Sequence, residues 1–166
     1  MQIQIVDKND TVIGTKERDE IDYSSDIYRV SALWLTNSNG QALIAKRAMA
    51  KKNSPGKWGP AVAGTLETDE TYETNIYKEA QEEIGLSGVP FKEIKKVAIM
   101  EPGNPRHYFC QWYEATVDMP IEAFTRQVSE VDELAWIDTE VLKNEVRNSP
   151  EKYVPTMKQV IENLGL

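Results

Sequence analysis

The sequence of 166 residues has one cysteine and one histidine, and each scarcity excludes a kind of site. Cys110 cannot form a disulfide within the chain, and its apolar surroundings, YFCQWY, favour a buried structural thiol. A chain with His107 as its only histidine cannot build a histidine-rich metal centre. Because a lone histidine in an aromatic strand is more often packed or exposed than functional, His107 is only an alternative candidate for a catalytic base.

Basic residues and long apolar runs are also scarce. The chain has 19 Lys and Arg against 27 Asp and Glu, which gives a net charge of −8. This acidity argues against a nucleic acid polymer as a partner, since affinity for a phosphate backbone comes largely from clustered Lys and Arg. No apolar run reaches the roughly 18 residues of a membrane span, and the start, MQIQIVDKND, lacks the features of a secretion signal. We therefore expect a cytoplasmic protein with no membrane partner.

The composition that remains is typical of one globular domain. Hydrophobic residues make up 40% of the chain and charged residues 28%, so we expect a single domain over residues 1–166. Alternating residues followed by turn residues predict an N-terminal β-hairpin over residues 2–15. Residues 28–36 and 41–46 have strand composition and flank a strong turn at 37–40, which predicts a second hairpin.

Strands and helices also alternate in the second half of the chain. Strands are predicted at 91–100, 107–117 and 133–137. A short helix is predicted from Asp138 or Thr139 to about residue 146, and a terminal amphipathic helix over residues 154–164. The inner face of the terminal helix would carry Val154, Met157, Val160, Ile161 and Leu164. This order of elements predicts an α+β fold, an α/β/α sandwich with a mixed sheet.

The most informative stretch is residues 64–86, GTLETDETYETNIYKEAQEEIGL. Thr71 is a good helix N-cap, and Gly85 can take the left-handed position after the helix end. A helix is therefore predicted over residues 72–84. Its apolar positions recur at helical spacing and comprise Ile76, Tyr77, Ala80 and Ile84.

Three carboxylates share one face of that helix. Glu79, Glu82 and Glu83 stand at i, i+3 and i+4, so their like charges repel. A bound Mg²⁺ or Mn²⁺ would reverse this penalty, because both ions prefer oxygen ligands. The alternative is a solvated acidic helix face, which is common in proteins.

The wider spacing resembles the Nudix box, G-x5-E-x7-R-E-U-x-E-E-x-G-U, where U is aliphatic. The box glycines fall on Gly64 and Gly85 and its first glutamate on Glu70, while Lys78 replaces the arginine and keeps the charge without the planar fork. The resemblance implies the Nudix fold, with a mixed β-sheet and a catalytic loop and helix, and hydrolysis of phosphoanhydride bonds.

A more distant resemblance covers roughly the first 90 residues. The segments VDKNDTVIGT and KRAMAKKNSPGKW, together with the box, are similar to the subgroup that contains type I isopentenyl diphosphate isomerase and related hydrolases. Two diphosphate-binding residues of that subgroup fall on Arg47 and Lys51. The alternative for the basic residues of KRAMAKKNSPGKW is a solvated loop. The isomerase cysteine before the box glycine and the histidine after it are replaced by Ala63 and Thr65.

Other isomerase site positions are replaced as well. Tyr28 stands where a metal-binding histidine is expected, and Arg106 and Tyr108 stand where acidic residues are expected. The isomerase chemistry itself is therefore not expected of this chain.

The resemblance also implies roles for individual residues. Glu79, Glu82 and Glu83 would hold one to three Mg²⁺ or Mn²⁺ ions, with the backbone carbonyl of Ala63 as a further ligand. Glu82 is the first choice for the general base, and the outside candidates are Glu101, Glu130 and Glu133. Glu70 would pair with Lys78 and support the site together with Gly64 and Gly85.

The expected function is metal-dependent hydrolysis of a diphosphate bond in a nucleoside diphosphate linked to another group, X. The partner would be a small phosphorylated substrate, and the Pro/Gly loop at 101–106 could line its pocket. The identity of X stays open, and oxidised nucleotides, nucleotide sugars, dinucleoside polyphosphates, NAD-like molecules and prenyl diphosphates all stay candidate substrates. The alternatives are an enzyme resembling isopentenyl-diphosphate isomerase and a non-catalytic module that senses a nucleotide. Because Nudix relatives often dimerise, a homodimer is one expected state.

Overall fold

The computed structural model describes residues 1–100 and 105–166. The predicted loop at 101–106 therefore lies largely outside the described residues, as does Glu101. The nine named strands are β1 (Gln2–Val6), β2 (Val12–Glu17), β3 (Ile27–Thr36), β4 (Gln41–Arg47), β5 (Trp58–Pro60), β6 (Val62–Thr65), β7 (Lys92–Ile99), β8 (His107–Thr116) and β9 (Val131–Asp138). The helices are α1 (Tyr72–Ile84), α2 (Thr139–Asn148) and α3 (Met157–Leu164), with 3-10 turns η1 (Arg18–Glu20), η2 (Ile121–Ala123) and η3 (Pro150–Lys152).

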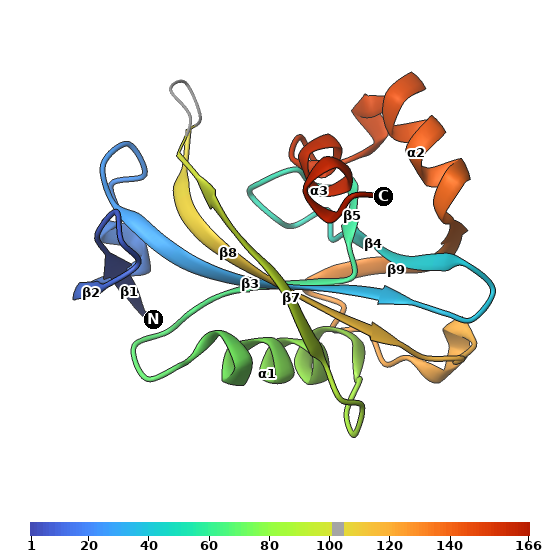
Figure 1. Ribbon diagram of the computed structural model, residues 1–166, viewed down its shortest axis with the longest axis horizontal. Helices are drawn as coiled ribbons and strands as arrows, with labels where there is room; N and C mark the ends of the chain where they lie inside the picture. Colours follow the sequence, from blue (N-terminus) through green and yellow to red (C-terminus); the bar gives the residue numbers. More distant parts are fainter. Residues whose placement is uncertain (101–104) are drawn as a thin grey trace.

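The strands form a connected mixed sheet between two helical layers. Figure 1 shows α1 on one side of the sheet and α2 and α3 on the other. Each face has its own apolar core, one including Ile76 and Ile84 of α1, the other Leu142 of α2 and Met157 of α3. This arrangement confirms the predicted α/β/α sandwich. No helix among the described residues is both long and apolar enough to cross a membrane.

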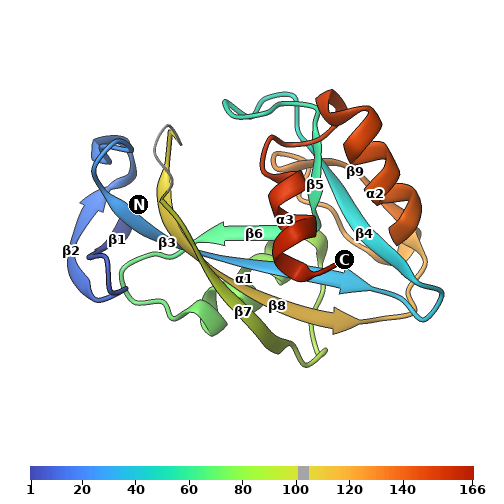
Figure 2. The ribbon, with the colours of Figure 1, turned by 45° about the horizontal axis from the view of Figure 1, so that its top comes forward.

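Strand β3 is the organising strand of the sheet. Along its whole length it pairs in parallel with β8, from Ile27 with His107 to Thr36 with Thr116. Its other edge is therefore shared by three antiparallel partners in turn, which are β1, β6 and β4. Because β6 pairs with residues 30–33 in the middle of β3, the strand that leads into α1 lies at the centre of the molecule (Figure 2).

The second predicted hairpin exists only at its turn. Strands β3 and β4 are registered antiparallel at Thr36 and Ala42, next to the turn. β4 then diverges and pairs with β5 on one side and with β9 on the other. The divergence follows from competition for one edge, since β6 already occupies the hydrogen-bonding groups of β3 that a longer hairpin would need.

The terminal helix begins later than predicted. It starts at Met157, three residues after the expected start at Val154. Val154 precedes Pro155, and a residue before proline is disfavoured in the helical region because of the proline ring. Val154 instead packs against the core as part of the connecting segment, and its N–H donates to the Trp58 carbonyl at 2.8 Å.

Candidate active site

The loop between β6 and α1 and the helix itself are built from local signals. The side chain of Thr71 accepts from the Thr74 N–H, and the Thr74 hydroxyl accepts from the Thr71 N–H, which closes a capping box. The helix ends at Ile84 because Gly85 takes a left-handed conformation with φ of 68°. The helix spans Tyr72–Ile84, as the sequence predicts.

Glu79 lies against the backbone of Gly64. A Cβ atom added to Gly64 would sit 2.6 Å from Glu79 Oε1, a distance that no real Cβ contact shows. Gly64 is therefore required for close approach rather than for an unusual backbone angle. Burial raises the pKa of the Glu79 carboxyl to about 7, the Glu82 charge adds to the shift, and the Lys78 charge opposes it.

Glu83 follows one helical turn later in similar surroundings. Burial raises the pKa of its carboxyl to about 8, and the charges of Glu79 and Glu130 add to the shift. Contact with the backbone N–H of Ala63 partly offsets it. Both carboxylates therefore lie against β6, at Gly64 and Ala63, whereas Glu82 is exposed to solvent.

The donor set suits a hard divalent cation. Glu79, Glu82 and Glu83 offer carboxylate oxygens, which Mg²⁺ and Mn²⁺ prefer. Burial raises the pKa of Glu79 and Glu83, repulsion from neighbouring glutamates adds to the rise, and a cation would remove that repulsion. As placed, no three His, Cys, Asp or Glu side chains in the described part of the chain converge closely enough to hold an ion. The residues fit the ion by their chemistry, and their convergence on one point requires side-chain rotation.

A charged cluster supports Glu79 from the loop side. Lys78 Nζ forms ion pairs with Glu70 and, at 2.9 Å, with Glu67, and it lies 3.9 Å from Glu79. The carboxylate of Glu70 also accepts from the Glu67 N–H at 2.9 Å. Burial alone would raise the pKa of Glu70, but these hydrogen bonds outweigh it and lower the pKa. Glu70 and Lys78 are thus in contact, as the sequence predicts.

Asn75 is a member of this cluster that sequence reasoning missed. It lies on α1, and its side chain is fully buried. The amide donates to Glu70 Oε2 at 2.8 Å and lies 3.4 Å from Glu79 Oε1, while its oxygen accepts from the Ser31 hydroxyl. The available signal was a polar residue beside the apolar positions of an amphipathic helix, where a buried amide needs partners.

Lys51 lies close to Glu130 and Glu83, whereas Arg47 bonds within its own loop. Lys51 forms an ion pair with Glu130, whose charge faces Glu83. The loop of Glu130 is held to the helix end, because the Gln127 N–H donates to the Glu83 carbonyl at 2.9 Å. Arg47 lies at the end of β4, and its Nε donates to the Asn53 carbonyl at 2.8 Å within the same basic loop.

Comparisons with known proteins give the family of the chain. The NUDIX domain family matches residues 27–164, which is most of the chain. The chain belongs to the Nudix family. Among its relatives, a prenyl-diphosphate phosphatase of Methanosarcina mazei is 30% identical over 159 residues, covering 96% of this chain and 92% of the relative. An isopentenyl-diphosphate Delta-isomerase of Corynebacterium diphtheriae is 26% identical, covering 92% and 87%.

A solved structure shows the same fold. The crystal structure of a Deinococcus radiodurans protein superposes with a TM-score of 0.82 at 20% identity, covering 98% of each chain. Together these findings make the protein a Nudix hydrolase and confirm its relation to the isomerase subgroup.

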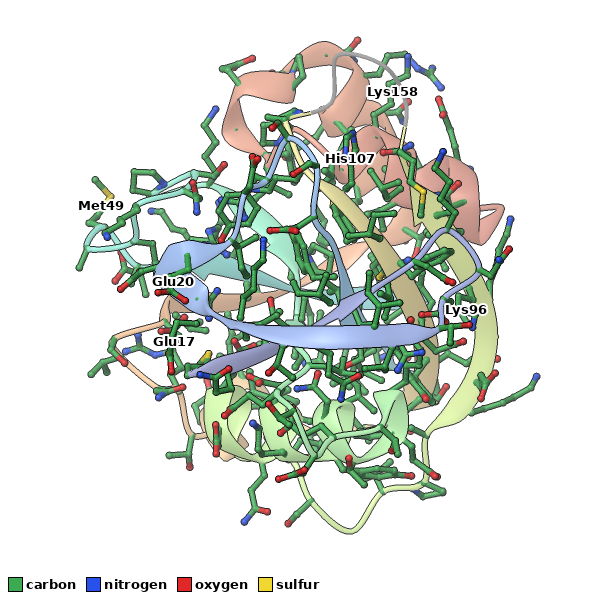
Figure 3. The ribbon with its side chains drawn as sticks, turned by 90° about the vertical axis from the view of Figure 1, so that its left-hand side faces the viewer. Glu17, Glu20, Met49, Lys96, His107 and Lys158 are labelled. Atoms are coloured by element: carbon green, nitrogen blue, oxygen red, sulfur yellow. The ribbon has the colours of Figure 1, made fainter. Side chains whose placement is uncertain are left out.

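His107, the alternative base candidate, lies away from α1. His107 opens β8, and Figure 3 shows it in the upper part of the molecule, with α1 at the bottom. Tyr28 stacks on Tyr108 at 5.5 Å between ring centroids, and Arg106 lies over the Tyr23 ring. These aromatic contacts are made at the sequence positions where the isomerase resemblance would place site residues. The single cysteine, Cys110, is buried as predicted, and burial raises the pKa of its thiol to about 12.

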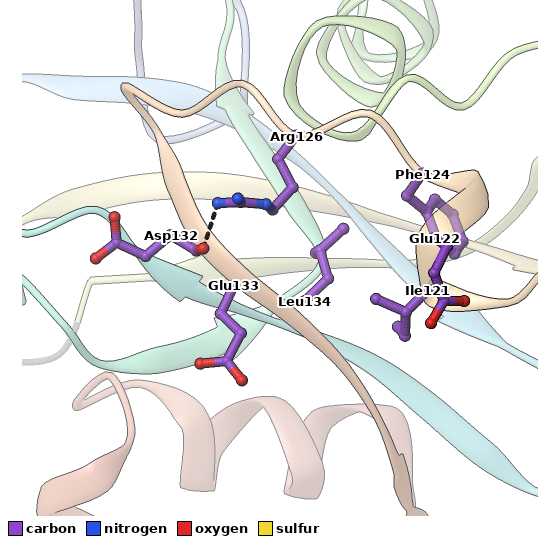
Figure 4. A pocket seen from close by; sticks show the side chains of 7 residues that line it. All are labelled: Ile121, Glu122, Phe124, Arg126, Asp132, Glu133 and Leu134. Atoms are coloured by element: carbon purple, nitrogen blue, oxygen red, sulfur yellow. Dashed lines mark hydrogen bonds between the residues drawn. The ribbon is translucent and has the colours of Figure 1, made fainter.

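Two hollows lie near the site. One borders the segment after β8, and the other borders the loop between β6 and α1, called the Nudix loop below. The first, of about 280 Å³, lies between η2 and β9 and includes Glu133, the remaining base candidate (Figure 4). There the guanidinium of Arg126 donates to the backbone carbonyl of Asp132, while Glu133 lies 3.9 Å from Lys46. The second, of about 590 Å³, is lined by Gln2, Glu67, Thr68, Asp69, Glu70 and Lys78. Neither hollow is lined by Glu79, Glu82 or Glu83.

Proposed function

We propose that this Nudix hydrolase cleaves the phosphoanhydride bond of a small diphosphate compound and depends on Mg²⁺ or Mn²⁺. The observation that carries the proposal is the pairing of Glu79 and Glu83 on one face of α1, both facing β6 and both with a raised pKa. Half-buried carboxylates that repel each other are costly unless a cation joins them. The fold retains this costly arrangement where α1 packs against β6.

Glu79, Glu82 and Glu83 would hold the ion, with the backbone carbonyl of Ala63 as a further ligand. When bound, such an ion offsets phosphate charge and acidifies water. Gly64 lets Glu79 approach the strand backbone, and the Glu70, Asn75 and Lys78 cluster orients it. The protein part of the site is thus a set of oriented oxygen donors.

Glu82 is the proposed general base. It is exposed, whereas Glu79 and Glu83 are partly covered, so it can reach a water molecule on the solvent side of the helix. Glu130 is the second candidate, since it lies near Glu83, but its ion pair with Lys51 already engages its carboxylate. A general base must accept a proton, and pairing with a lysine opposes that.

Lys51 is proposed to bind the non-reacting phosphate. Its ammonium group lies beside Glu130 and close enough to Glu83 for its charge to oppose the rise that burial causes in the pKa of that carboxyl. Exchange of the Glu130 partner for a phosphate would bring the cation onto the substrate. Arg47 would act from the same loop after releasing the Asn53 carbonyl.

The substrate would be a diphosphate with a variable group X. A nucleoside diphosphate linked to X is the class implied by the Nudix box, and the prenyl-diphosphate phosphatase relative favours a prenyl diphosphate as a second candidate. An isomerase reaction is disfavoured because Ala63 and Thr65 supply neither a thiol nor an imidazole.

The test is product analysis over a panel of diphosphates with Mg²⁺ or Mn²⁺. The panel includes nucleotide sugars, dinucleoside polyphosphates, oxidised nucleotides and prenyl and isopentenyl diphosphates. Glu83→Gln is the control, because it keeps the side-chain shape and removes the charge. Release of phosphate or a monophosphate product that depends on Glu83 supports the proposal. Saturable binding without cleavage would support a sensing module instead, and isomerised isopentenyl diphosphate would support an isomerase.

A further inference from the structure

The N-terminal hairpin lies outside the residues that match the Nudix family but contacts the Nudix loop. The family match begins at residue 27, whereas β1 and β2 span residues 2–17. β1 runs beside the loop that connects β6 to α1. Its Gln4 N–H donates to the Leu66 carbonyl at 3.3 Å, and the Thr68 N–H donates to the Gln2 carbonyl at 3.0 Å. The loop is thereby joined to the hairpin as an added strand.

The side chain of Gln4 makes the most concentrated contact between the two. It is only 3% exposed, although an alternating strand pattern would place it on the solvent face. Its amide nitrogen donates to three loop carbonyls, those of Glu67 at 2.7 Å, Thr68 at 3.1 Å and Glu70 at 2.7 Å. One buried amide group thus binds three backbone carbonyls of the loop.

A hydrogen bond to the oxygen of that amide fixes its orientation. Gln4 Oε1 accepts from Arg29 Nη1 at 3.0 Å, so the oxygen faces the arginine and the nitrogen faces the loop. Arg29 is held in turn by Asp10 in the hairpin turn, with 2.6 Å between Nε and Oδ1. Figure 3 shows Lys96 beside this end of the hairpin, and its Nζ lies 2.6 Å from Asp10 Oδ2. The hairpin, β3 and β7 therefore set the direction in which Gln4 donates.

Side-chain contacts connect this loop to Glu79. Glu70 ends the gathered segment, and its carboxylate binds Lys78 and the Asn75 amide. Both of those side chains approach Glu79, at 3.9 Å and 3.4 Å respectively. A displacement of the loop backbone at Glu70 therefore changes the surroundings of the carboxylate that lies against Gly64.

We propose that Gln4 is a positioning residue for the Nudix loop, so that residues outside the family match complete the metal-binding geometry. The inference rests on the proposed metal-dependent function, because the outcome it predicts is weaker metal binding. Gln4 itself touches neither Glu79 nor Glu83 in the contacts described above. Loss of its two donor hydrogens would remove this donor from the carbonyls of Glu67, Thr68 and Glu70, and the loop would relax away from β1.

The experiment compares Gln4→Leu and Gln4→Glu with Ile5→Val. Both Gln4 variants remove the donors, and the second keeps the shape and still accepts from Arg29. Ile5 points to the opposite face of β1 and is buried, so its variant disturbs the hairpin without touching the loop. Hydrogen exchange of the amides at 67–71 and calorimetric titration with Mn²⁺ alone are measured on all three full-length proteins.

Both Gln4 variants should make the loop more accessible to exchange and should weaken metal binding. The amides at 67–71 should exchange about 10-fold faster, and the Mn²⁺ dissociation constant should rise about 10-fold, as for loss of an outer-shell partner. Ile5→Val should leave both values as in the wild type. Unchanged exchange and unchanged Mn²⁺ binding in Gln4→Leu would overturn the positioning role. A wild-type protein that binds no Mn²⁺ would overturn the proposed function, while the exchange rates would still decide the role of Gln4 in the loop.

Discussion

The carboxyl group of Glu79 occupies the space where any residue other than glycine at position 64 would place its Cβ atom. Gly64 has an ordinary strand backbone within β6, so its value lies in the missing side chain. The strand can therefore carry an alanine at this position without backbone strain, and only the glutamate must move. A substitution at Gly64 can therefore displace Glu79 without disturbing the fold, which makes it a useful test of the site.

Gly64→Ala should abolish most activity and leave the fold intact. Displacing Glu79 by about 1 Å should lower kcat by about 100-fold, the effect expected of such a misplacement. The melting temperature should change by less than about 4 °C, corresponding to about 1 kcal/mol in a chain of this size. Steady-state kinetics and thermal unfolding check both values.

Gly14→Ala is the matched control for this substitution. Gly14 also lies in a strand, β2, and an added Cβ there would meet nothing within 4 Å. It should keep wild-type kinetics. Full activity in Gly64→Ala would show that Glu79 is not placed by this contact.

Lys78 should matter through its charge more than through its shape. Lys78→Met removes the cation between Glu67 and Glu70, so activity should fall by about 10- to 100-fold, the usual cost of losing an outer-shell partner. Lys78→Arg should keep most of the activity, because the family places arginine here and the guanidinium can bridge two carboxylates.

The pH profile of Lys78→Met gives a second readout. Burial raises the pKa of Glu79, and the Lys78 charge opposes this rise. Removing the cation should raise that pKa above about 7, so a more alkaline solution would be needed to ionise Glu79. The acidic limb of the kcat profile should therefore move to higher pH in Lys78→Met and stay in place in Lys78→Arg. A shift to lower pH would contradict the assignment.

Lys51 and Lys52 are neighbours with different surroundings, which allows a paired test. Lys51 is partly buried and bound to Glu130, whereas Lys52 is exposed. Lys51→Met should raise KM for the diphosphate substrate by about 10-fold, the equivalent of one charge-assisted hydrogen bond. Lys52→Met should leave KM unchanged at moderate salt. An equal rise in both would indicate general electrostatic attraction and not a phosphate contact.

Local signals explain why α1 was predictable to the residue. Thr71 and Gly85 determine its ends through neighbouring backbone groups, and the apolar spacing determines its buried face. Pro155 was an equally local signal for the late start of α3, but periodicity extended the predicted helix through it. The pattern at 64–86 likewise identified the glutamates, because chemistry and spacing both lie within one segment.

The parts that escaped prediction depend on contacts distant in sequence. Gln4 is buried by a loop more than 60 residues away, and its alternating strand gives no sign of this. Asn75 is buried between α1 and the sheet, where its side-chain oxygen accepts from the Ser31 hydroxyl of β3. The early divergence of β4 from β3 follows from competition with β6 for one strand edge. Sequence patterns report which residues prefer an element, but such competition is decided only when the elements assemble.

Asp10 should make the stability of the hairpin depend on acid pH. Its side chain is only 8% exposed and binds Arg29, Lys96 and the hydroxyl of Tyr72. Burial would raise the pKa of this carboxyl, but the hydrogen bonds from Lys96, Arg29 and Tyr72 outweigh burial and lower it. A depressed pKa in the folded state means that the stabilisation is complete above the ordinary Asp pKa, and that it is lost as the pH falls through the folded value.

Asp10→Asn therefore tests a charge and not a backbone preference. Asp10 has a φ of 61°, which asparagine also tolerates, so the turn should persist. At pH 7 the substitution should lower the free energy of unfolding by about 2 kcal/mol, the scale of hydrogen bonds to a charged group. The difference from wild type should shrink as the pH falls below about 4. Urea unfolding at several pH values measures it, with Asp19→Asn, an exposed carboxylate, as the control. A difference that is constant with pH would show that the ion pairs of Asp10 contribute no net stability, because only the charged form of Asp10 distinguishes the two proteins.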